Sequence, residues 1–420
     1  MKNTVKWSSI ALAVAMGNAM ISSQAVAGEG FVEGASATLS NRTVYFNRDF
    51  RNAASGEQSK AEETGTGFLL NFESGFTEGP IGLGADVVAS AGFKVDSGKG
   101  RAGTGLLEMG NNDRANSEYS EIRGAVKANI LGDTTLRYGV HFPENPVVAY
   151  EDARLLPQHY QGYSITNSSI DGLFVEAGRM NKRGEMDDSS ESSKVSAVVA
   201  DANKVTYLGG TYAFAENLSA SLYTSKMDKG WKRHFLGATH TADLGNGLSL
   251  TSDLAHYHTS DDSPSGNSFQ NKASSLAFTL GAGHHAVTAA YQRMSGDAGF
   301  DYDDRAIFLA NSVQIMDFNA KDERSWQARY DYDFEGLGIP GLSFMTRYVR
   351  GSNIDNGAFV SDGKRWERNS ELRYTVQAGA LEGLNLRWRN ATLRQNDAGL
   401  AGSTDIDENR LIVSYTWNLL

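Results

Sequence analysis

Residues of alternating polarity recur through almost the whole chain, and this pattern constrains the fold more than any other feature. Clear examples are residues 35–40, 136–142, 326–334, 384–389 and 411–420. Successive side chains of a β-strand point to opposite faces, so strict alternation gives each strand one polar and one apolar face. The chain has neither a sustained apolar stripe at helical spacing nor a composition change that marks a domain boundary. The sequence therefore predicts one all-β domain with many strands.

Two kinds of connection separate the predicted strands. Short turns rich in Gly, Asn, Asp and Glu occupy residues 131–133, 215–217, 244–247, 334–336 and 381–383. Long polar connections occupy residues 181–204, 260–272 and 352–368. Short turns at one end and long loops at the other are typical of outer-membrane β-barrels. The pattern therefore favours an antiparallel barrel that crosses a membrane.

The N-terminal segment has the features of a secretory signal peptide. Lys2 and Lys6 precede an apolar run at residues 10–21, and an Ala-Val-Ala cleavage motif ends at Ala27. A membrane anchor is the alternative, but the apolar run is shorter than the roughly 20 residues of a spanning helix. We therefore expect a signal peptide at residues 1–27 and one barrel domain at residues 28–420. At roughly 20–24 residues per strand and connection, the barrel domain would hold about 16 to 20 strands.

Composition narrows the class of protein further. With a mean hydropathy of -0.39 and 40% hydrophobic residues, the chain is too polar for a bundle of membrane helices. A formal net charge of -11 disfavours binding to nucleic acid. Aromatic residues such as Trp326, Tyr330 and Tyr332 share one strand face, as expected for a barrel with aromatic girdles facing lipid. A secreted sandwich or solenoid is the alternative, and it would bury its apolar face instead.

Basic residues alternate with these apolar positions and would therefore face the barrel lumen. They are Arg42, Arg123, Lys127, Arg137, Arg329, Arg347, Arg373, Arg387 and Arg389. A guanidinium group can bind both oxygens of a carboxylate, and a row of such groups can pass an anion along. Alternatively, these arginines pair with lumenal acids such as Glu121, Glu371, Asp331 and Asp333. The pattern favours a channel for anions, and a structural or adhesive barrel is the second hypothesis.

Several segments resemble the OprD family of Pseudomonas-type substrate-specific porins. The matching segments are residues 31–33, 45–50, 67–76, 103–107, 136–139 and 409–413, with the most specific at 145–148, 154–158 and Gly162. The resemblance covers essentially the whole chain after the signal peptide. It implies an 18-stranded monomeric barrel in the outer membrane of a Gram-negative bacterium. It also implies passive, selective uptake of small carboxylate-bearing nutrients, either amino acids or aromatic and other organic acids.

The resemblance also implies two groups of functional residues. A basic ladder along one wall would include Arg42, Arg48, Arg373, Arg387, Arg389 and Arg410, and we add Arg137, Arg329 and Arg347 from the alternation. A long loop folded into the lumen would form a constriction, with Tyr150, Glu151, Asp152 and Arg154 at or near it. The family often has a small polar residue and an Asp before its Arg-Leu-Leu-Pro motif, whereas this chain has Glu151-Asp152-Ala153. The additional carboxylate is expected to affect which solutes pass.

Sequence motifs for catalysis or metal binding give no strong signal. Gly-x-Ser-x-Gly, His-Glu-x-x-His and similar motifs do not occur, so we expect no enzyme, no catalytic residue and no cofactor. His284-His285 and His256-x-His258 have no third ligand nearby in the sequence, and the chain has no Cys. Residues 301–304 could ligate calcium, but a solvated acidic loop is the preferred interpretation. The expected partners are small carboxylate solutes, outer-membrane lipid and lipopolysaccharide.

Overall fold

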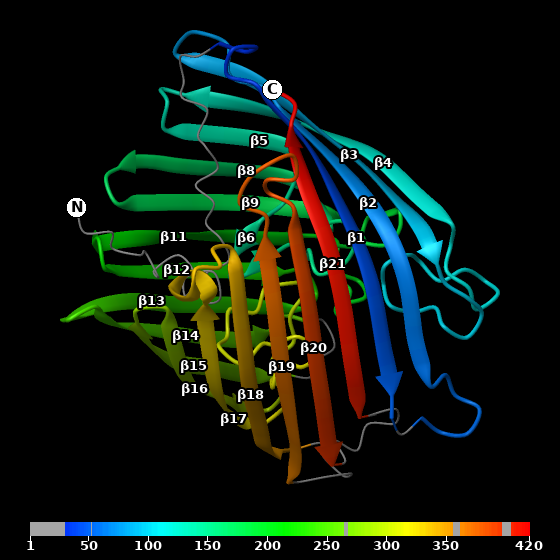
Figure 1. The fold of residues 1–420 in the computed structure, drawn as a ribbon. Coiled ribbons are helices and arrows are strands. Elements are labelled where there is room, and N and C mark those ends of the chain that lie inside the picture. The colour runs from blue at the N-terminus through cyan, green and yellow to red at the C-terminus, as the bar shows by residue number, and fades with distance from the viewer. Residues whose placement is uncertain (1–29, 52, 264–267, 356–361, 397–404) are drawn as a thin grey trace.

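The chain folds into a closed antiparallel β-barrel of 18 strands (Figure 1). The computed structural model describes residues 30–51, 53–263, 268–355, 362–396 and 405–420, so the predicted signal peptide lies outside the described residues. The barrel strands are β1 (Ser36–Phe50), β2 (Lys60–Glu73), β3 (Ile81–Asp96), β4 (Glu118–Ile130), β5 (Thr134–His141), β8 (His159–Ile170), β9 (Leu173–Gly184), β11 (Val205–Ala215), β12 (Leu218–Met227), β13 (Trp231–Gly245), β14 (Leu248–Asp261), β15 (Gln270–Ala282), β16 (His285–Gly296), β17 (Arg324–Asp333), β18 (Leu342–Ile354), β19 (Gly363–Thr375), β20 (Asn385–Asn396) and β21 (Ile406–Asn418). Each strand pairs with the next along the chain.

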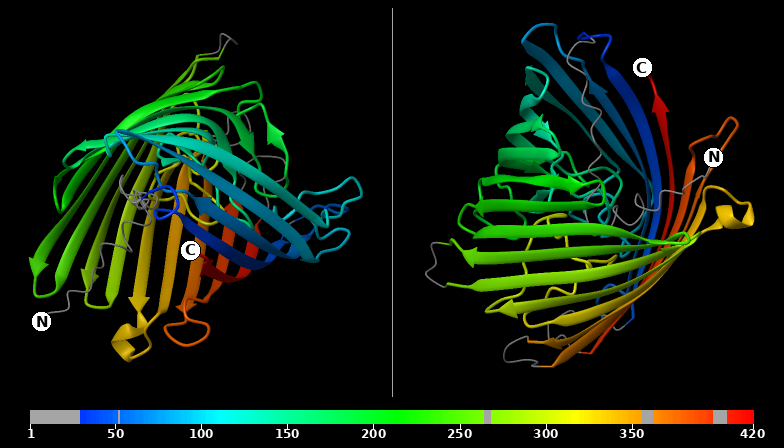
Figure 2. Two further views of the ribbon diagram at one scale, coloured as in Figure 1. Left: turned by 90° about the horizontal axis from the view of Figure 1, so that it is seen from above. Right: turned by 90° about the vertical axis from the view of Figure 1, so that its left-hand side faces the viewer.

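Pairing of the first and last strands closes the barrel. β1 and β21 are antiparallel from Thr38 opposite Asn418 to Phe50 opposite Ile406. They lie side by side in Figure 1 as the blue and red arrows, and Figure 2 shows the strands curving around one interior. Closure leaves no unpaired strand edge, which a sheet in lipid requires because hydrocarbon cannot satisfy backbone groups. The predicted fold class and strand number are confirmed.

Three short strands and one 3-10 helix are not among the 18 barrel strands. β6 (Glu144–Asn145) and β7 (Val148–Ala149) form a separate hairpin, and β10 (Glu191–Ser192) pairs briefly with β9. The 3-10 helix η1 (Phe334–Leu337) connects β17 and β18. Among the described residues, no helix combines the length and the hydropathy needed to cross a membrane.

The connections alternate as predicted between short turns and long loops. All five predicted short turns fall between consecutive strands or at their ends. In one of them, Gly245, Asn246 and Gly247 all have positive φ angles, which explains the Gly-Asn-Gly sequence of this tight turn. The opposite end carries the long connections, including residues 97–117, 142–158, 185–204 and 297–323. We refer to these two ends as the short-turn end and the long-loop end.

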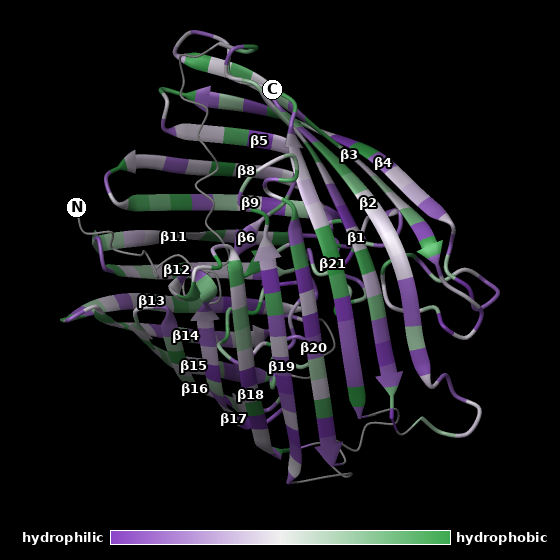
Figure 3. Cartoon of the chain, viewed as in Figure 1, coloured by the Kyte–Doolittle hydropathy of each residue, from purple (hydrophilic) through white to green (hydrophobic). Residues whose placement is uncertain are grey.

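The two faces of the barrel wall show the polarity of a membrane protein. Large apolar side chains point outward and are exposed: Ile122 is 74% exposed, Leu222 66% and Tyr138 65%. Polar side chains such as Glu63 and Gln292 point inward and are fully buried. Purple and green bands accordingly alternate along the strands in Figure 3. This polarity is the inverse of a soluble sandwich, so the secreted sandwich is excluded.

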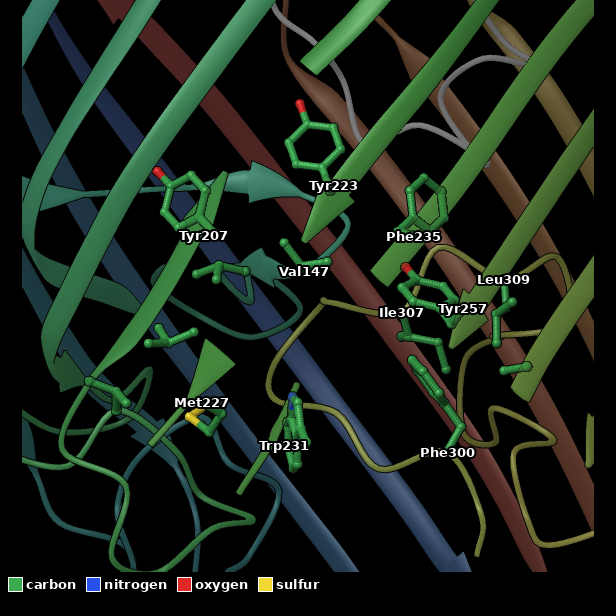
Figure 4. Packing of buried hydrophobic residues seen from close by; sticks show 14 of the residues in the cluster. Val147, Tyr207, Tyr223, Met227, Trp231, Phe235, Tyr257, Phe300, Ile307 and Leu309 are labelled. Carbon is green, nitrogen blue, oxygen red and sulfur yellow. The ribbon is translucent and has the colours of Figure 1, made fainter. Parts of the chain in front are cut away.

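Two long loops pack against the inner wall formed by β11 to β15. Val147 and Val148 of the 142–158 loop belong to one buried cluster with Phe300, Ile307 and Leu309 of the 297–323 loop. The wall contributes Tyr207, Tyr223, Phe235, Tyr257 and Ala273 to the same cluster. Figure 4 shows Val147 near Tyr207 and Tyr223, and the second loop gathered around Tyr257. This part of the interior is therefore an apolar core.

Candidate functional site

The inner wall from β17 through β21 to β1 carries a dense set of arginines. On these six neighbouring strands, eight predicted ladder residues share the inward face of the barrel: Arg42, Arg48, Arg329, Arg347, Arg373, Arg387, Arg389 and Arg410. The register places Arg329 directly opposite Arg347, Arg373 opposite Arg387, and Arg389 opposite Arg410. The fold thus brings residues 42–48 next to residues 329–410, and we call this surface the arginine wall.

Three wall carboxylates partly neutralise these arginines. Glu371 lies 2.5 Å from Arg387, 2.9 Å from Arg373 and 3.3 Å from Arg389. Asp331 pairs with Arg329 at 2.7 Å. Glu408 binds Arg48 and Arg410, each at 2.7 Å. Pairing with lumenal acids is therefore correct for most of the wall, because six of the eight guanidinium groups pair with these three carboxylates.

Some guanidinium groups on the wall retain unused donors. Arg347 donates to the Asn369 side chain at 2.7 Å and makes no ion pair with any described residue. The Nε atom of Arg387 is buried without a hydrogen-bond partner among the described residues, whereas that of Arg389 lies 3.3 Å from the Glu371 carboxylate. Buried N–H groups without partners are costly, so an anion at this surface would gain hydrogen bonds that the protein alone leaves unmade.

Arg137 lies away from the arginine wall. It is on β5, where it and Lys127 of β4 both contact the buried Asp86 of β3 at 2.7 Å. Its Nε also donates to the Val140 carbonyl oxygen at 3.0 Å. Both donors toward Asp86 and Val140 are thus engaged within the wall. Alternation predicted the lumenal face of Arg137 correctly, but β2, β3 and β4 separate this residue from β1.

The 142–158 loop reaches from the arginine wall to the opposite side of the barrel. Asp152 pairs with Arg42 at 2.6 Å, and Arg410 donates to the Ala153 carbonyl oxygen at 3.2 Å. Leu155 and Leu156 are buried in a cluster that includes Val44 and Phe46 of β1. At its other end, the Tyr257 hydroxyl of β14 donates to the Pro146 carbonyl oxygen at 3.0 Å. Since β1 and β14 are distant strands of one closed barrel, the loop spans part of the interior.

The four predicted constriction residues have different surroundings. Tyr150 packs edge-on against Phe142, with ring centroids 5.3 Å apart. Asp152 is exposed beside Arg42, as described above. Glu151 lies 3.8 Å from Arg305, and burial raises the pKa of its carboxyl group. Glu151 and Asp152 therefore place two carboxylates on this loop, one half-buried and one exposed.

Arg154 stabilises the 142–158 loop more than it is available to bind a solute. Its Nε donates to the Thr104 carbonyl oxygen at 3.0 Å, and its guanidinium lies 5.4 Å from the Phe46 ring centre. Burial lowers the pKa of Arg154 to about 10, with repulsion from Arg410 and Arg48 acting in the same direction. The group stays charged at neutral pH, and its positive charge adds to that of the adjacent arginine wall.

A second inward loop, residues 297–323, was missed by the sequence analysis. Gln314 donates to Glu408 at 2.8 Å, and the amides of Ile315 and Met316 donate to Glu367 at 3.0 and 2.8 Å. Arg305 of the same loop faces Glu151. The segment holds several large apolar residues, unlike the Ser- and Asp-rich loops, and that composition is the signal that could have identified it.

Two acids of this second loop correct a sequence-based expectation. Asp303 is 5% exposed and accepts hydrogen bonds from the Ser196 hydroxyl at 2.6 Å and the Ala197 amide at 2.8 Å. Asp304 pairs with the buried Arg183 at 2.5 Å. The expectation of a solvated acidic loop at residues 301–304 is therefore wrong for these two residues. They tie the 297–323 loop to the 185–204 connection and to β9.

Comparison with known proteins identifies the family. The family model for outer membrane porins of the OprD family matches residues 29–419. This chain belongs to the OprD family of outer-membrane porins. It is 37% identical to Porin D of Pseudomonas aeruginosa, over 99% of each chain. The porin therefore resides in the outer membrane of a Gram-negative bacterium, and its relatives are channels rather than enzymes.

Solved structures of relatives share the barrel. The porin matches P. aeruginosa OccK9 (OpdG) with a TM-score of 0.88 at 38% identity, covering 93% of this chain and 100% of that chain. It matches P. aeruginosa OpdK, in a structure with vanillate, with a TM-score of 0.85 at 32% identity and the same coverage.

The porin also gathers one set of possible metal ligands that the sequence did not indicate. At the short-turn end, ligand atoms of His284, Asp333 and Glu335 lie within 4.8 Å of one another. The end of β17 and the helix η1 thus supply two carboxylates that are about 50 positions away from His284 in the chain. Asp333 already accepts a hydrogen bond from the Glu335 amide at 2.9 Å, as the cap of η1. We assign no metal to this group.

Proposed function

We propose that this porin is a passive channel selective for small carboxylate-bearing solutes. The excess of arginines over carboxylates on the wall from β17 to β1 carries this proposal. A guanidinium group binds a carboxylate through two parallel hydrogen bonds, which gives both attraction and orientation. Several such groups on neighbouring strands offer successive weak sites, so a solute can be exchanged along the wall without being trapped.

The 142–158 loop supplies the constriction in this proposal. Its contacts with Arg42 and Arg410 place Asp152 and Ala153 beside the arginine wall. A solute would pass between this loop and the wall, and Glu151 and Asp152 would disfavour solutes with surplus negative charge. We further propose that residues 1–27 are removed on export and that the barrel acts as a monomer.

The solute class has support from a relative. The structure of P. aeruginosa OpdK holds vanillate, whose carboxylate is carried on an aromatic ring. For this porin we propose recognition of the carboxylate and not of the aromatic ring, because the arginine wall would bind the charged group. Uptake measured over a panel of amino acids, aromatic acids and aliphatic acids of similar size would then define the preferred member of the class.

Replacing two wall arginines tests the proposal. In the double variant Arg347→Gln and Arg389→Gln, liposome swelling driven by a carboxylate should slow about tenfold, since one charge-assisted hydrogen bond contributes about 1.5 kcal/mol. Swelling driven by a neutral analogue of the same size should not change. The matched control removes two exposed outward cations instead, Lys60→Gln and Lys182→Gln.

Two results would overturn the proposal. Carboxylate uptake that is equal in the double variant and in the control would remove the role of the arginine wall. Single-channel recording of the folded wild-type porin in planar bilayers addresses the alternative of a structural or adhesive barrel. A current no larger than the leak would exclude a channel altogether.

A further inference from the structure

The outer surface of five neighbouring strands carries a second group of cations. Lys272 on β15, Arg293 on β16, Arg324 on β17, Arg350 on β18 and Arg368 on β19 are all exposed. Each is flanked in the chain by two buried residues, such as Gln292 and Met294 around Arg293. Alternation therefore directs all five side chains away from the lumen. We call this surface the outer cationic patch.

The patch lies toward the cell exterior. Each of its residues is in the half of its strand that is nearer the long-loop end, and Arg324 is the first residue of β17. In outer-membrane barrels the long loops are extracellular and the short turns periplasmic. The patch therefore faces the outer leaflet of the membrane near its headgroups, where a cation on a hydrocarbon-facing strand costs least.

The five cations make no ion pair with any residue that the structure describes. Neighbouring outward cations do: Lys226 and Lys232 share Asp262 at 2.8 and 2.9 Å, and Arg394 pairs with Asp407 at 2.9 Å. Moreover, Arg293 and Arg324 are direct cross-strand partners. Like charges in that position repel each other, so an external anion would stabilise this arrangement.

Aromatic rings are interleaved with the patch. Trp326 and Tyr348 have ring centroids 5.7 Å apart, and Tyr348 and Trp366 follow at 5.6 Å. The register places Arg350 opposite both Trp326 and Trp366. Trp and Tyr concentrate where hydrocarbon meets headgroups. The surface therefore combines an apolar strip with cations, which suits an amphiphile with an anionic head.

We propose that the outer cationic patch binds the phosphate groups of lipopolysaccharide in the outer leaflet. The five strands span about 20 Å at the usual strand spacing, which exceeds the width of one phosphate and fits a headgroup with several. The acyl chains would lie along Trp326, Tyr348 and Trp366. This inference is independent of the solute, because the patch faces lipid and the arginine wall faces the lumen.

Binding of purified lipid A to the folded porin in detergent, followed by native mass spectrometry, tests the inference. The variant replaces Arg293, Arg324, Arg350 and Arg368 by Gln. We expect it to bind bisphosphorylated lipid A at least about tenfold more weakly than wild type, with the loss shrinking as salt concentration rises. The control removes four outward cations that have carboxylate partners, by replacing Lys60, Lys182, Lys226 and Lys232 with Gln.

Other results would overturn the inference. Equal lipid A affinity in wild type and variant would exclude the patch as the site. Dephosphorylated lipid A binding as tightly as the bisphosphorylated form would exclude phosphate recognition. Phosphatidylglycerol binding equally well would make the occupant a glycerophospholipid, and loss of a dimer in the variant would make it a second copy of the porin. If the variant fails the heat-modifiable gel shift of a folded barrel, Arg293→Gln with Arg324→Gln replaces it, with a smaller loss expected.

Discussion

The inner surface of this barrel has two contrasting regions. The arginine wall, from β17 to β1, presents eight guanidinium groups, with Arg347 lacking an ion pair among the described residues. The wall from β11 to β15 presents Tyr207, Phe235 and Tyr257, and two loops cover it. Both regions arise from the same strand alternation, and only the inward residues differ.

The contrast between the two regions indicates which inner surface an inward loop can cover at a favourable free energy. Apolar and aromatic side chains gain about 25 cal/mol for each Å² of surface that a loop removes from water. Covering a guanidinium group with the same apolar loop would instead cost several kcal/mol in desolvation. The loops therefore pack their apolar residues on apolar side chains, including Leu155 and Leu156 on Val44 and Phe46 of β1. They meet the arginines themselves through polar contacts such as Asp152 with Arg42. The space for solute is expected on the charged side.

Loss of the Tyr257 hydroxyl should have the largest effect on the contrast between the aromatic wall and the arginine wall. That group accepts a hydrogen bond from the Phe308 amide at 2.9 Å and donates to the Pro146 carbonyl oxygen at 3.0 Å, so it joins both loops to β14. Tyr257→Phe keeps the ring and should destabilise the porin by about 2–4 kcal/mol, because two buried polar groups lose a partner. Thermal unfolding measures this, and open-channel noise should increase. Tyr291→Phe on the outer surface is the control, and equal unfolding temperatures would contradict the assigned role.

Neutralising Glu371 should increase the net positive charge of the arginine wall. Glu371→Gln leaves Arg373, Arg387 and Arg389 without their shared carboxylate. Anion selectivity should rise, and affinity for a carboxylate solute should increase about fivefold, corresponding to roughly 1 kcal/mol for a charge pair near water. Reversal potentials in a salt gradient measure the selectivity. Glu216→Gln in the exposed short turn is the control. A reduced anion selectivity would show that Glu371 organises the arginines for binding instead of competing with solute.

A pH change should have the smallest effect, at the place where the two regions meet. Because burial raises the pKa of Glu151, this carboxyl group becomes neutral at a higher pH than a free glutamate, whose pKa is about 4.3. Lowering the pH therefore removes a negative charge from the 142–158 loop, and anion conductance should increase modestly. Glu151→Gln should show the higher conductance already at neutral pH and lose this part of the pH dependence. A variant with the full wild-type pH response would rule out Glu151 as its source.

Much of the fold could be predicted from local pattern. Alternation at residues 326–334 and 411–420 gave the strands β17 and β21, and Gly-Asn turns gave the short-turn end. The same alternation assigned the lumenal face of Arg347 and Arg389 correctly. The resemblance to a family supplied the strand number of 18 and the interest in residues 145–162. Strand geometry is local, so period-two patterns determine which face each residue occupies.

Contacts between distant segments could not be predicted in this way. Arg154 was expected at the constriction, yet two of its donors bind the backbone oxygens of Thr104 and Ala153. Residues 301–304 were expected to form a solvated acidic loop, yet Asp303 is buried and accepts a hydrogen bond from Ser196, and Asp304 pairs with Arg183. Sequence parity shows that Asp86 and Arg137 share the lumen, but not that they touch.

The sequence alone determined that the chain is an outer-membrane barrel with arginines on its inner face, because each strand needs only its own residues to set inside and outside. The tertiary structure decided which arginines stay available and which are neutralised, because this depends on cross-strand register and on which loops return to the lumen. Glu371 binds three arginines only because β19 and β20 pair in one register. Electrostatic attraction falls with distance in space, and distance in space is what the fold adds to the sequence.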